Sequence, residues 1–493
     1  MADSMPRKPV FIGFDIGTTQ VKGGLFDQTG QVLASFSRPY PTHRPGPGLV
    51  EQDPEDWMRG LREGLEELTA AIEPSRIAAL GLCSQVNTDV FVDDLGRPLM
   101  PAIVWQDLRS QAEAAELVAG FTAQDRAEWW GEGMDVPVGP SHVLPKMLWL
   151  SRHHPGLWAR CAHVLTPKDY CLFHLTGRAL ADPIAAWGQV GADHRYVAGM
   201  LARVPGAAQR LPPLQAMTQT VGTTLIAGHE VPVVAGTMDA WGNLFGCGVF
   251  RPGQGMYMSG TSEILAIAGD RRTTAPGVVT FPTVEKMVVH AGPTQSGADC
   301  LRWWANIANI APLDVPRLAA QADRRGNPVL FLPHLEGERA PLWDSETRGA
   351  FIGLDSRSGP AEAALAVLEG VALSSRLLLD ALKQAAGFTP RHLLYGGGGS
   401  QSDLWSQIRA DCLGIPLHRL AHADIGCLGA AIMAAVGVGR YAHMADAVPA
   451  MTNIERVFTP DPTMRPRYDR MFAAYGQAID ALHPMRAMMA APV

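Results

Sequence analysis

Two short apolar segments joined by a glycine–threonine turn occur twice in the chain, about half its length apart. The first turn is Gly17-Thr18-Thr19 and the second is Ser259-Gly260-Thr261-Ser262, and each lies between two runs with the composition of β-strands. Two similar strand–turn–strand units at this separation indicate a duplicated architecture with two related lobes. Strand-like runs also alternate with helical patterns along the chain, which predicts an α/β fold.

The length of 493 residues suggests two or three domains, or two large ones. The turn Arg251-Pro252-Gly253 interrupts the pattern near the middle of the chain. We therefore expect an N-terminal lobe over 1–250 and a C-terminal lobe over 251–493.

Hydrophobic periodicity predicts the main elements of both lobes. Helices are expected over 57–72, 360–387, 402–412 and 424–437, and strands over 10–14, 21–26, 31–37, 77–83, 90–92, 102–104, 231–235, 255–258, 264–268 and 393–395. The helix over 360–387 has the clearest pattern, because its leucines form one stripe and Gly387 lies at a C-cap position. The segment 424–437 is rich in small residues, so we expect it to pack closely against its neighbours.

Charge and cysteine content narrow the class of protein. The chain carries 41 Lys and Arg against 48 Asp and Glu, so a long nucleic-acid-binding surface is not expected. The seven cysteines form no CxxC pair, which is typical of reduced thiols. The polar segment 1–8 leaves no room for a secretory signal, and the apolar stretch 428–438 is about half the ~20 residues that a membrane helix needs. We expect a soluble cytoplasmic protein with no membrane partner.

Asp15 stands at the end of the first strand, directly before Gly17-Thr18-Thr19. A glycine turn exposes backbone N–H groups and the threonines add hydroxyl donors, so the turn suits a phosphate. A carboxylate repels phosphate directly, but it can approach phosphate through Mg²⁺, which favours carboxylate, water and phosphate oxygens. Asp15 therefore marks a candidate metal–phosphate corner; the alternative is a β-turn capped by an aspartate.

Two more glycine-rich turns resemble this one. The turn at Gly260-Thr261 offers the same donors, and four consecutive glycines, 396–399, follow a strand and precede a helix. The ribose and base of a nucleotide would fit at the glycine run. None of the three turns has a P-loop or Rossmann fingerprint, and an ordinary hairpin turn is the alternative at Gly260. Together the three turns favour a nucleotide held between two lobes.

Asp239 follows the strand 231–235. A carboxylate at the C-terminal end of a strand in an α/β sheet is placed to accept a proton from a substrate hydroxyl. The alternative is a helix N-cap, a position that aspartate favours.

Trp105 and Asp107 belong to a polar cluster that follows the strand 102–104. Asp107 could bind two hydroxyls of a polyol while Trp105 stacks on the apolar face of the same ligand. The alternative is an ion pair of Asp107 with Arg109 and a core position for Trp105.

Nine short segments spread along the chain form a recognisable series. They are FDIGTTQVK (14–22), VEQDPEDW (50–57), PAIVWQDLR (101–109), PKMLWL (145–150), KDYCLFHLTG (168–177), VVAGTMDAWGNLFGCG (233–248), MSGTSE (258–263), FLPHLEGERAPLWDSETRGAFIGL (331–354) and LYGGGGSQSDLWSQIRADCLGIPL (394–417). In these segments the chain resembles the FGGY family of carbohydrate kinases over nearly its full length. Each segment is short, but their order and spacing together are specific.

The resemblance implies two ribonuclease-H-like lobes of the actin-like ATPase type, with ATP and a sugar in a central cleft and Mg²⁺ as the metal. It implies Asp239 as catalytic base and Asp15 as the carboxylate on the metal side. The nucleotide-binding candidates are Gly17, Thr18, Thr19, Lys22, Gly260, Thr261, Gly398, Gly399, Ser402 and Asp403. The substrate-binding candidates are Gln85, Val86, Asn87, Trp105, Asp107 and Asp239.

Members of the family phosphorylate pentuloses, hexuloses, glycerol, erythritol and other polyols. The overall likeness is greatest to xylulose kinases, which usually carry Gly-Gln-Met-His where this chain has Ser84-Gln85-Val86-Asn87. Glycerol kinases carry Asn-Gln-Arg-Glu there, which does not match either. We expect a ketopentose kinase, with D-xylulose as the first candidate and another ketose or a polyol as the alternative.

Two other classes of function fit the same fold. A non-catalytic sugar or ATP sensor would tolerate loss of the base, whereas this chain retains both Asp15 and Asp239. An actin-like filament protein would polymerise on addition of ATP. The family resemblance also implies a homodimer as the candidate assembly.

Overall fold

The computed structural model describes residues 8–70, 72–131, 136, 138–281, 283–422 and 424–490. Apart from Lys8, the segment 1–8 discussed above lies outside the described residues. Within them, no helix is both long and apolar enough to cross a membrane. All seven cysteines are buried and none forms a disulfide.

The chain divides into two compact units. Unit 1 consists of 1–248 together with 424–452, and unit 2 consists of 249–423 together with 453–493. The first break lies two residues before the expected end of the N-terminal lobe. The segment 424–452 was expected in the C-terminal lobe, and the structure instead assigns it to unit 1.

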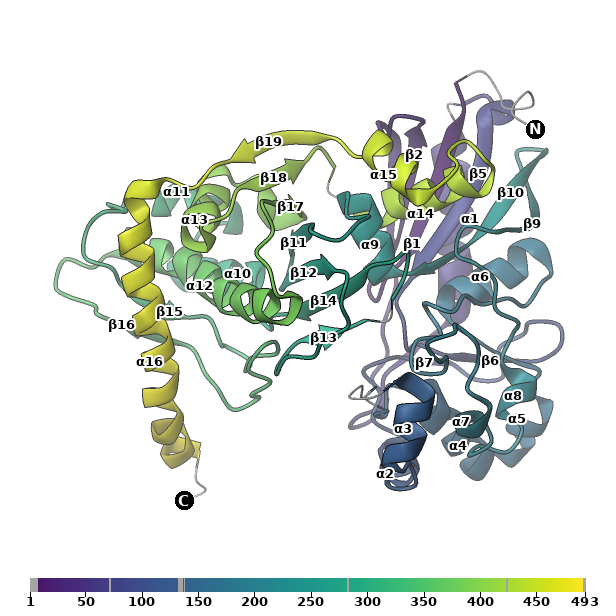
Figure 1. The fold of residues 1–493 in the computed structure, drawn as a ribbon. Helices are drawn as coiled ribbons and strands as arrows, with labels where there is room; N and C mark the ends of the chain where they lie inside the picture. Colours follow the sequence, from purple (N-terminus) through teal and green to yellow (C-terminus); the bar gives the residue numbers. More distant parts are fainter. Residues whose placement is uncertain are drawn as a thin grey trace. The chain divides into compact units, whose positions relative to one another are not determined.

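Unit 1 is built on a six-stranded sheet of order β3-β2-β1-β5-β10-β9 (Figure 1). Its strands are β1 (Val10–Ile16), β2 (Gln20–Asp27), β3 (Val32–Pro39), β4 (Glu51–Gln52), β5 (Ile77–Ser84), β6 (Val90–Val92), β7 (Ala102–Ile103), β8 (His163–Leu165), β9 (Thr220–Ile226) and β10 (His229–Met238). Its helices are α1 (Pro54–Thr69), η2 (Pro74–Arg76), α2 (Gln111–Ala119), α3 (Ala123–Trp130), α4 (Val143–His153), α5 (Pro155–Arg160), α6 (Pro167–Thr176), α7 (Ala198–Leu201), α8 (Ala207–Arg210), α9 (Asp239–Cys247), α14 (Ile425–Gly437) and α15 (Met444–Met451).

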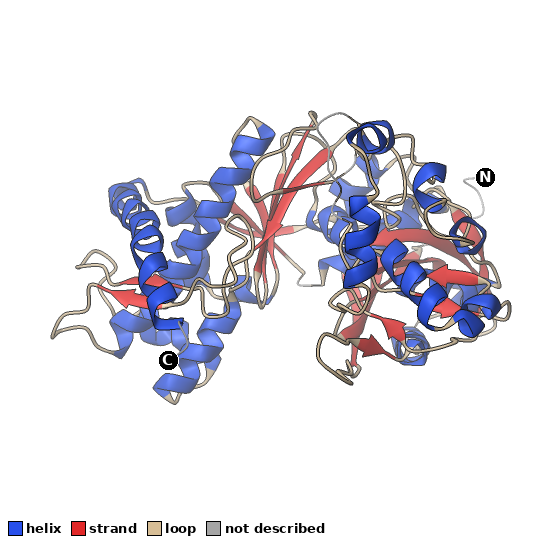
Figure 2. Ribbon diagram, turned by 90° about the horizontal axis from the view of Figure 1, so that it is seen from below, coloured by secondary structure: helices blue, strands red, loops and turns tan. Residues whose placement is uncertain are grey.

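Unit 2 is built on a seven-stranded sheet of order β13-β14-β12-β11-β17-β18-β19, with helices beside it (Figures 1 and 2). Its strands are β11 (Gly255–Ser259), β12 (Glu263–Gly269), β13 (Val279–Thr280), β14 (Val288–Pro293), β15 (Leu330–Leu332), β16 (Ala350–Ile352), β17 (Leu393–Gly396), β18 (Leu417–Leu420) and β19 (Ile454–Phe458). Its helices are α10 (Ala298–Ala308), η3 (Pro312–Asp314), α11 (Val315–Ala319), α12 (Pro360–Ala386), η4 (Gly398–Gln401), α13 (Asp403–Leu413), η5 (Pro462–Met464) and α16 (Arg465–Ala490).

The two sheets share one topology, which agrees with the expected duplication. In unit 1 the antiparallel strands β1, β2 and β3 are followed by β5 and β10, which run parallel to β1. In unit 2 the antiparallel strands β11, β12 and β14 are followed by β17 and β18, parallel to β11. The chain thus has two related α/β units, as in actin-like ATPases.

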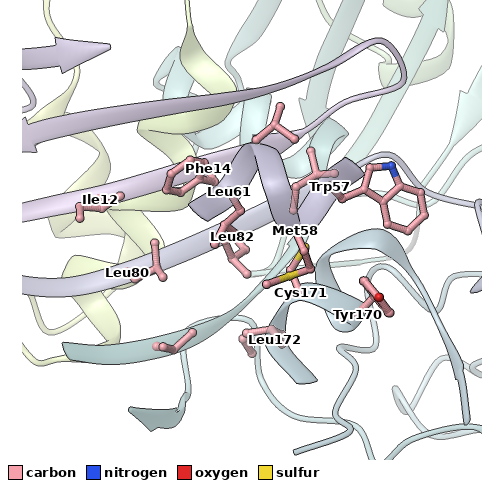
Figure 3. Close-up of a cluster of buried hydrophobic side chains, with 14 of the residues drawn as sticks. Ile12, Phe14, Trp57, Met58, Leu61, Leu80, Leu82, Tyr170, Cys171 and Leu172 are labelled. Carbon is pink, nitrogen blue, oxygen red and sulfur yellow. The ribbon is translucent and has the colours of Figure 1, made fainter. Parts of the chain in front are cut away.

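Successive residues of β1 face opposite sides of the unit 1 sheet, and the two sides pack against different helices. Ile12 and Phe14 join the hydrophobic core formed with α1 and α6 (Figure 3). Gly13 faces α14 on the other side, where a Cβ atom would lie 1.9 Å from the carbonyl oxygen of Cys427. Asp15 shares the parity of Gly13 and therefore faces α14 as well.

Close packing of small residues explains why 424–452 belongs to unit 1. A Cβ atom on Gly81 of β5 would meet the carbonyl oxygen of Ala430 at 2.1 Å, and one on Gly246 of α9 would meet that of Ile425 at 1.8 Å. Glycine at these positions lets α14 lie directly on the sheet and on α9. The sequence predicted the helix and its close packing, but not its partner.

Candidate active site

Three parallel strands of unit 1 end together at one edge of the sheet. The register pairs Ile16 of β1 with Ser84 of β5, and Ser84 with Met238 of β10. In parallel sheets such C-terminal edges carry ligand sites, because the loops that follow the strands lie side by side there. Asp15 lies near the end of β1, Gly17 to Thr19 and Gln85 to Asn87 follow β1 and β5, and Asp239 directly follows β10.

Asp15 lies at the N-terminal end of helix α14. A Cβ atom on Gly426 would lie 2.6 Å from Oδ2 of Asp15 and 3.2 Å from Oδ1 of Asn243, so glycine leaves room for both oxygens. Oδ1 of Asp15 is buried and accepts no hydrogen bond from the described part of the chain. Burial raises the pKa of Asp15 to about 6, against the opposing effect of the Lys22 ammonium.

Asp239 is the first residue of α9, directly after β10. The N-cap position belongs to Met238, so the alternative of an Asp239 N-cap is wrong. Oδ1 of Asp239 accepts a hydrogen bond of 2.7 Å from the backbone N–H of Ala240. Burial raises the pKa of Asp239 to about 7, and the negative charge of Asp15 adds to the shift, so the two carboxylates interact electrostatically.

The residues at this edge fit a divalent cation. The orphaned Oδ1 of Asp15 and the side-chain oxygen of Asn243 are hard oxygen donors, which Mg²⁺ and Ca²⁺ prefer. Asp424, the N-cap residue of α14, adds a carboxylate whose charge also raises the pKa of Asp15. A cation here would neutralise the clustered negative charge.

In the turn Gly17-Thr18-Thr19, only some of the backbone N–H groups expected to bind a phosphate are available. The N–H of Gly17 donates to the carbonyl oxygen of Gln20 at 3.1 Å, so it is used inside the hairpin. The N–H groups of Thr18 and Thr19 donate no hydrogen bond within the described part of the chain, and they remain available for an anion. Nζ of Lys22 forms an ion pair of 2.8 Å with Asp424 beside this turn.

Asn87 has the backbone conformation of a left-handed turn, with φ of 56°. Its carbonyl oxygen accepts a 2.5 Å hydrogen bond from Nζ of Lys146, a buried lysine that also binds Asp89 at 2.9 Å. The side-chain amide of Asn87 has no partner among the described residues, and Asn87 and Val86 are both half-buried. Lys146 therefore fixes the backbone while the Asn87 side chain stays free for a ligand.

Gln85 was expected to contact the sugar, but its side chain is 2% exposed and engaged internally. Its Nε2 donates to Gln52 at 2.9 Å, and its Oε1 accepts from the Thr88 hydroxyl at 3.1 Å. Gln52 in turn donates to the carbonyl oxygen of Thr18 at 2.7 Å. Gln85 thus connects the turns after β1 and β5, and we interpret it as a positioning residue.

Trp105 and Asp107 differ in their exposure to solvent and in whether their polar atoms are available to a ligand. Trp105 is 38% exposed and its indole N–H donates to the Thr18 hydroxyl at 3.1 Å, so the alternative of a core tryptophan is wrong. Asp107 is buried, and its two oxygens accept four hydrogen bonds, three from Arg109 and one from the N–H of Val50. The alternative of an Asp107–Arg109 ion pair is therefore correct, because no oxygen lone pair is left for a sugar hydroxyl.

The nucleotide candidates of unit 2 lie on two adjacent strand ends. Gly260 closes the β11–β12 turn by donating to the carbonyl oxygen of Ser262 at 3.0 Å, and Thr261 is exposed. The glycines 397 and 399 are required by packing, since their Cβ atoms would lie 2.3 Å and 2.0 Å from atoms of Ser259. Gly398 is exposed with open space around it, so it is the glycine that leaves room for a ligand.

Arg409 of α13 connects the two turns of unit 2. Its guanidinium is fully buried and donates to the Ser259 hydroxyl at 2.7 Å, to Glu263 at 2.9 Å and to the carbonyl oxygen of Gly399 at 3.0 Å. It also lies 3.5 Å from the ring centre of Trp405. One side chain therefore fixes the relative position of the Gly260 turn and the glycine run.

Ser402 and Asp403 open helix α13. The Ser402 hydroxyl caps the helix by accepting from the N–H of Trp405 at 3.3 Å. Asp403 is exposed and forms ion pairs with Arg419 at 2.8 Å and Arg456 at 2.5 Å. Both side chains have structural partners, so any contact with a nucleotide adds to these roles.

Family models match most of the chain. The model of the FGGY family of carbohydrate kinases, N-terminal domain, matches residues 10–246, and the model of the C-terminal domain of the same family matches 255–438. The chain belongs to the FGGY family. It is an ATP-dependent sugar phosphotransferase, and kinases of this family use ATP as phosphate donor with a divalent metal.

Several FGGY kinases are similar along their full length. A xylulose kinase of Escherichia coli strain K12 is 30% identical, covering 97% of this chain and 100% of the relative. A glycerol kinase of Acaryochloris marina is also 30% identical, covering 92% and 95%. The crystal structure of a "xyloylose kinase" from Brucella ovis has 30% identity and a TM-score of 0.84, covering 97% of this chain and 100% of that chain.

Four contributors to this FGGY site were missed by the sequence reasoning. They are Gln52, Lys146, Asp424 and Arg409, which act through hydrogen bonds or ion pairs with residues far along the chain. Gln52, Lys146 and Arg409 lie inside the motif segments 50–57, 145–150 and 394–417, and this position could have identified them. Asp424 had no such signal, because its segment was assigned to the other lobe.

Proposed function

We propose that this kinase phosphorylates a ketopentose, with D-xylulose as the first candidate and its 5-hydroxyl as the acceptor. ATP is the donor and Mg²⁺ is the metal. The observation that carries the proposal is the pair Asp15, near the end of β1, and Asp239, directly after β10, whose carboxylates interact electrostatically. Support for the sugar comes from full-length relatives that are named xylulose kinases.

Asp239 is the proposed catalytic base. Phosphoryl transfer depends mainly on positioning and charge stabilisation, and a carboxylate that accepts the proton of the attacking hydroxyl assists the step. A pKa near 7 suits this task, because a base works best when its pKa is close to the operating pH. The hydrogen bond from Ala240 holds the carboxylate at the start of α9.

Asp15 is the proposed metal-side carboxylate, with Asn243 and Asp424 beside it. A bound Mg²⁺ would neutralise charge on the phosphate oxygens of ATP. The free N–H groups of Thr18 and Thr19 are proposed phosphate donors in unit 1, and Gly260 and Thr261 form the corresponding turn of unit 2.

The Val86-Asn87 pair is proposed to select the sugar. The Asn87 amide can donate and accept hydrogen bonds, which suits a polyhydroxylated ligand, and Lys146 holds its backbone in place. The same pair departs from the Met-His typical of xylulose kinases. This departure favours the alternative substrates. They are another ketose, such as ribulose or a hexulose, or a polyol, such as erythritol or glycerol.

The experiment is ADP release from Mg-ATP by the purified protein across D-xylulose, L-xylulose, D-ribulose, L-ribulose, D-fructose, erythritol and glycerol. The proposal predicts the highest kcat/KM for D-xylulose. A higher kcat/KM for another ketose or for a polyol would show that the kinase prefers that substrate. ATP binding without turnover of any of these sugars would contradict the proposal and favour a sensor.

A further inference from the structure

Unit 2 contains a pocket of about 750 Å³ that is separate from the glycine turns. Its walls come from the loop 325–328, from strands β15 and β16, and from the region where η5 leads into α16. The residues that line it are Arg325, Gly326, Asn327, Pro328, Leu330, Ile352, Gly353, Thr463, Met464, Pro466, Arg467, Arg470, Met471 and Ala474. The volume lies in the range of small-molecule sites.

Helix α12 separates this pocket from the sheet that carries the glycine turns. Leu378, Leu379 and Leu382 of α12 pack in one hydrophobic cluster with β11, β12 and β17. Other residues of α12, such as Leu365 and Leu368, pack in a second cluster with β15 and α16. Figure 1 shows α16 and the β15–β16 pair beyond α12. The pocket is therefore a second site, distinct from the candidate nucleotide turns of the same unit.

The lining carries three positive charges and no negative one. Arg467 is 10% exposed and is held in place by a 2.7 Å hydrogen bond to the carbonyl oxygen of Gly326 and by the buried carboxylate of Glu369. Arg325 is 68% exposed, bonds to the Thr463 hydroxyl at 3.0 Å and lies 3.6 Å from Asp461. Arg470 is exposed and has no partner in the described part of the chain.

The positive charges are therefore only partly compensated. Glu369 lies behind Arg467 and outside the lining, Asp461 forms a 3.6 Å ion pair with Arg325 from outside the lining, and Arg470 has no ion pair in the described part of the chain. Arginine presents a planar fork of N–H donors that matches the oxygens of a phosphate. Three such groups around one cavity favour a doubly charged oxyanion over a neutral ligand.

The remaining walls of the pocket are apolar. Leu330, Met464 and Met471 are almost fully buried at its base, whereas Ile352 is 38% exposed at the surface. An apolar surface beside an arginine cluster suits a molecule with two parts, one anionic and one hydrophobic. Free inorganic phosphate would use the arginines alone.

We propose that this pocket binds a phosphate ester of a small organic molecule, as a second ligand site of the kinase. Arg325, Arg467 and Arg470 bind the phosphate, and the organic group lies on Leu330, Met464 and Met471. No bond is formed or broken in this site. The site does not depend on which sugar the kinase phosphorylates.

The test is calorimetric titration of the full-length protein with phenyl phosphate, in the presence of saturating ADP to fill the nucleotide site. Arg470→Glu and Arg325→Glu change exposed side chains, so both variants should fold. Arg467 is left intact because its removal would leave Glu369 buried and unpaired. Arg317→Glu, on α11 of the same unit and 83% exposed outside the pocket, is the matched control.

We expect phenyl phosphate to bind more tightly than inorganic phosphate. Each pocket variant should weaken its binding by at least about tenfold, the range for a lost charge-assisted hydrogen bond, while Arg317→Glu should not change it. The proposal is overturned if the pocket variants bind like the wild type or if ADP abolishes binding. Equal affinity for inorganic phosphate would also overturn it, because the apolar wall would then contribute nothing.

Discussion

At the scale of single residues, the ionised carboxylate of Asp239 lowers the stability of the folded protein. Its pKa is raised from 3.8 to about 7, mainly by burial and also by Asp15. The folded protein thus retains a proton here between about pH 4 and 7 that the unfolded chain has released. This group does not lower the free energy of unfolding below about pH 4, where it is protonated in both states. The free energy of unfolding falls as the pH rises from about 4 to about 7. Ligand sites commonly contain such destabilising charges.

Asp239→Asn should therefore stabilise the metal-free protein at pH 8. The expected gain in the free energy of unfolding is about 1–2 kcal/mol, less than the full shift because Asp239 is partly exposed. The gain should shrink at pH 5, where the wild-type carboxyl is already protonated. Thermal unfolding in EDTA at both pH values measures it. A destabilised variant at pH 8 would contradict the assigned pKa direction.

Asn87 allows a separate test of sugar recognition. Asn87→Gly keeps the left-handed backbone, whose φ is 56°, whereas Asn87→Ala adds backbone strain of about 1 kcal/mol. If the side-chain amide binds the sugar, both variants should raise the KM for sugar about tenfold or more and leave the KM for ATP nearly unchanged. An unchanged sugar KM in Asn87→Gly would show that this side chain does not contact the sugar.

The residues that could be predicted are those whose chemistry is local. Asp15 lies near the end of β1 and Asp239 directly follows β10, and the apolar runs before them reveal these positions. Gln85 could not be assigned correctly, because its partner Gln52 is 33 residues away, whereas the ion pair of Asp107 with nearby Arg109 was one of two alternatives left open by the sequence. A polar residue in a motif can bind a ligand or bind the protein, and only the folded contacts distinguish the two.

At the scale of elements, helix α13 positions two turns through one side chain. Arg409 is bonded to Ser259, Glu263 and the carbonyl oxygen of Gly399. Lysine retains a positive charge beside Glu263 but cannot form the same set of bonds. We propose that Arg409 acts through these turns as a positioning residue for the nucleotide.

Arg409→Lys should raise the KM for ATP and the Kd for ADP about tenfold while changing the KM for sugar little. A purely structural role would instead lower stability and affect both substrates alike. Titration with ADP and steady-state kinetics separate these outcomes, with Arg317→Lys as the control. Unchanged ADP affinity in a folded Arg409→Lys protein would exclude the positioning role.

Sequence periodicity predicted most elements around the site. The expected helix 360–387 corresponds to α12, which ends before Gly387 in the left-handed conformation, and the helix 402–412 corresponds to α13. The short strands β13, β15 and β16 were not predicted, and neither were the longer strands β9, β14, β18 and β19.

At the scale of the whole molecule, the order of segments along the chain differs from their assignment to the two units. Helix α14 follows most of unit 2 in sequence, yet it covers β1 and β5 of unit 1 and provides the surroundings of Asp15. A small-residue helix predicts close packing but gives no information about its partner. For this reason the expected C-terminal lobe, 251–493, wrongly included 424–452, which belongs to unit 1.

A chain that ends at Phe250 should therefore not fold cooperatively, because the α14 face of its sheet would be exposed. Joining 424–452 to it through a flexible linker should restore a cooperative transition. Calorimetric unfolding of the two proteins tests this. A cooperative transition at the wild-type Tm in the shorter chain would show that α14 is dispensable for unit 1.

The most direct test of the account is ADP release with D-xylulose by the wild type, by Asp239→Asn and by Asp446→Asn. Asp446 lies in the first turn of α15 and is exposed, so it is the matched control. The account predicts turnover by the wild type and the control, and a decrease of at least ~10²-fold in Asp239→Asn with unchanged ADP affinity. Near-normal turnover in Asp239→Asn, or none in the wild type, would contradict it.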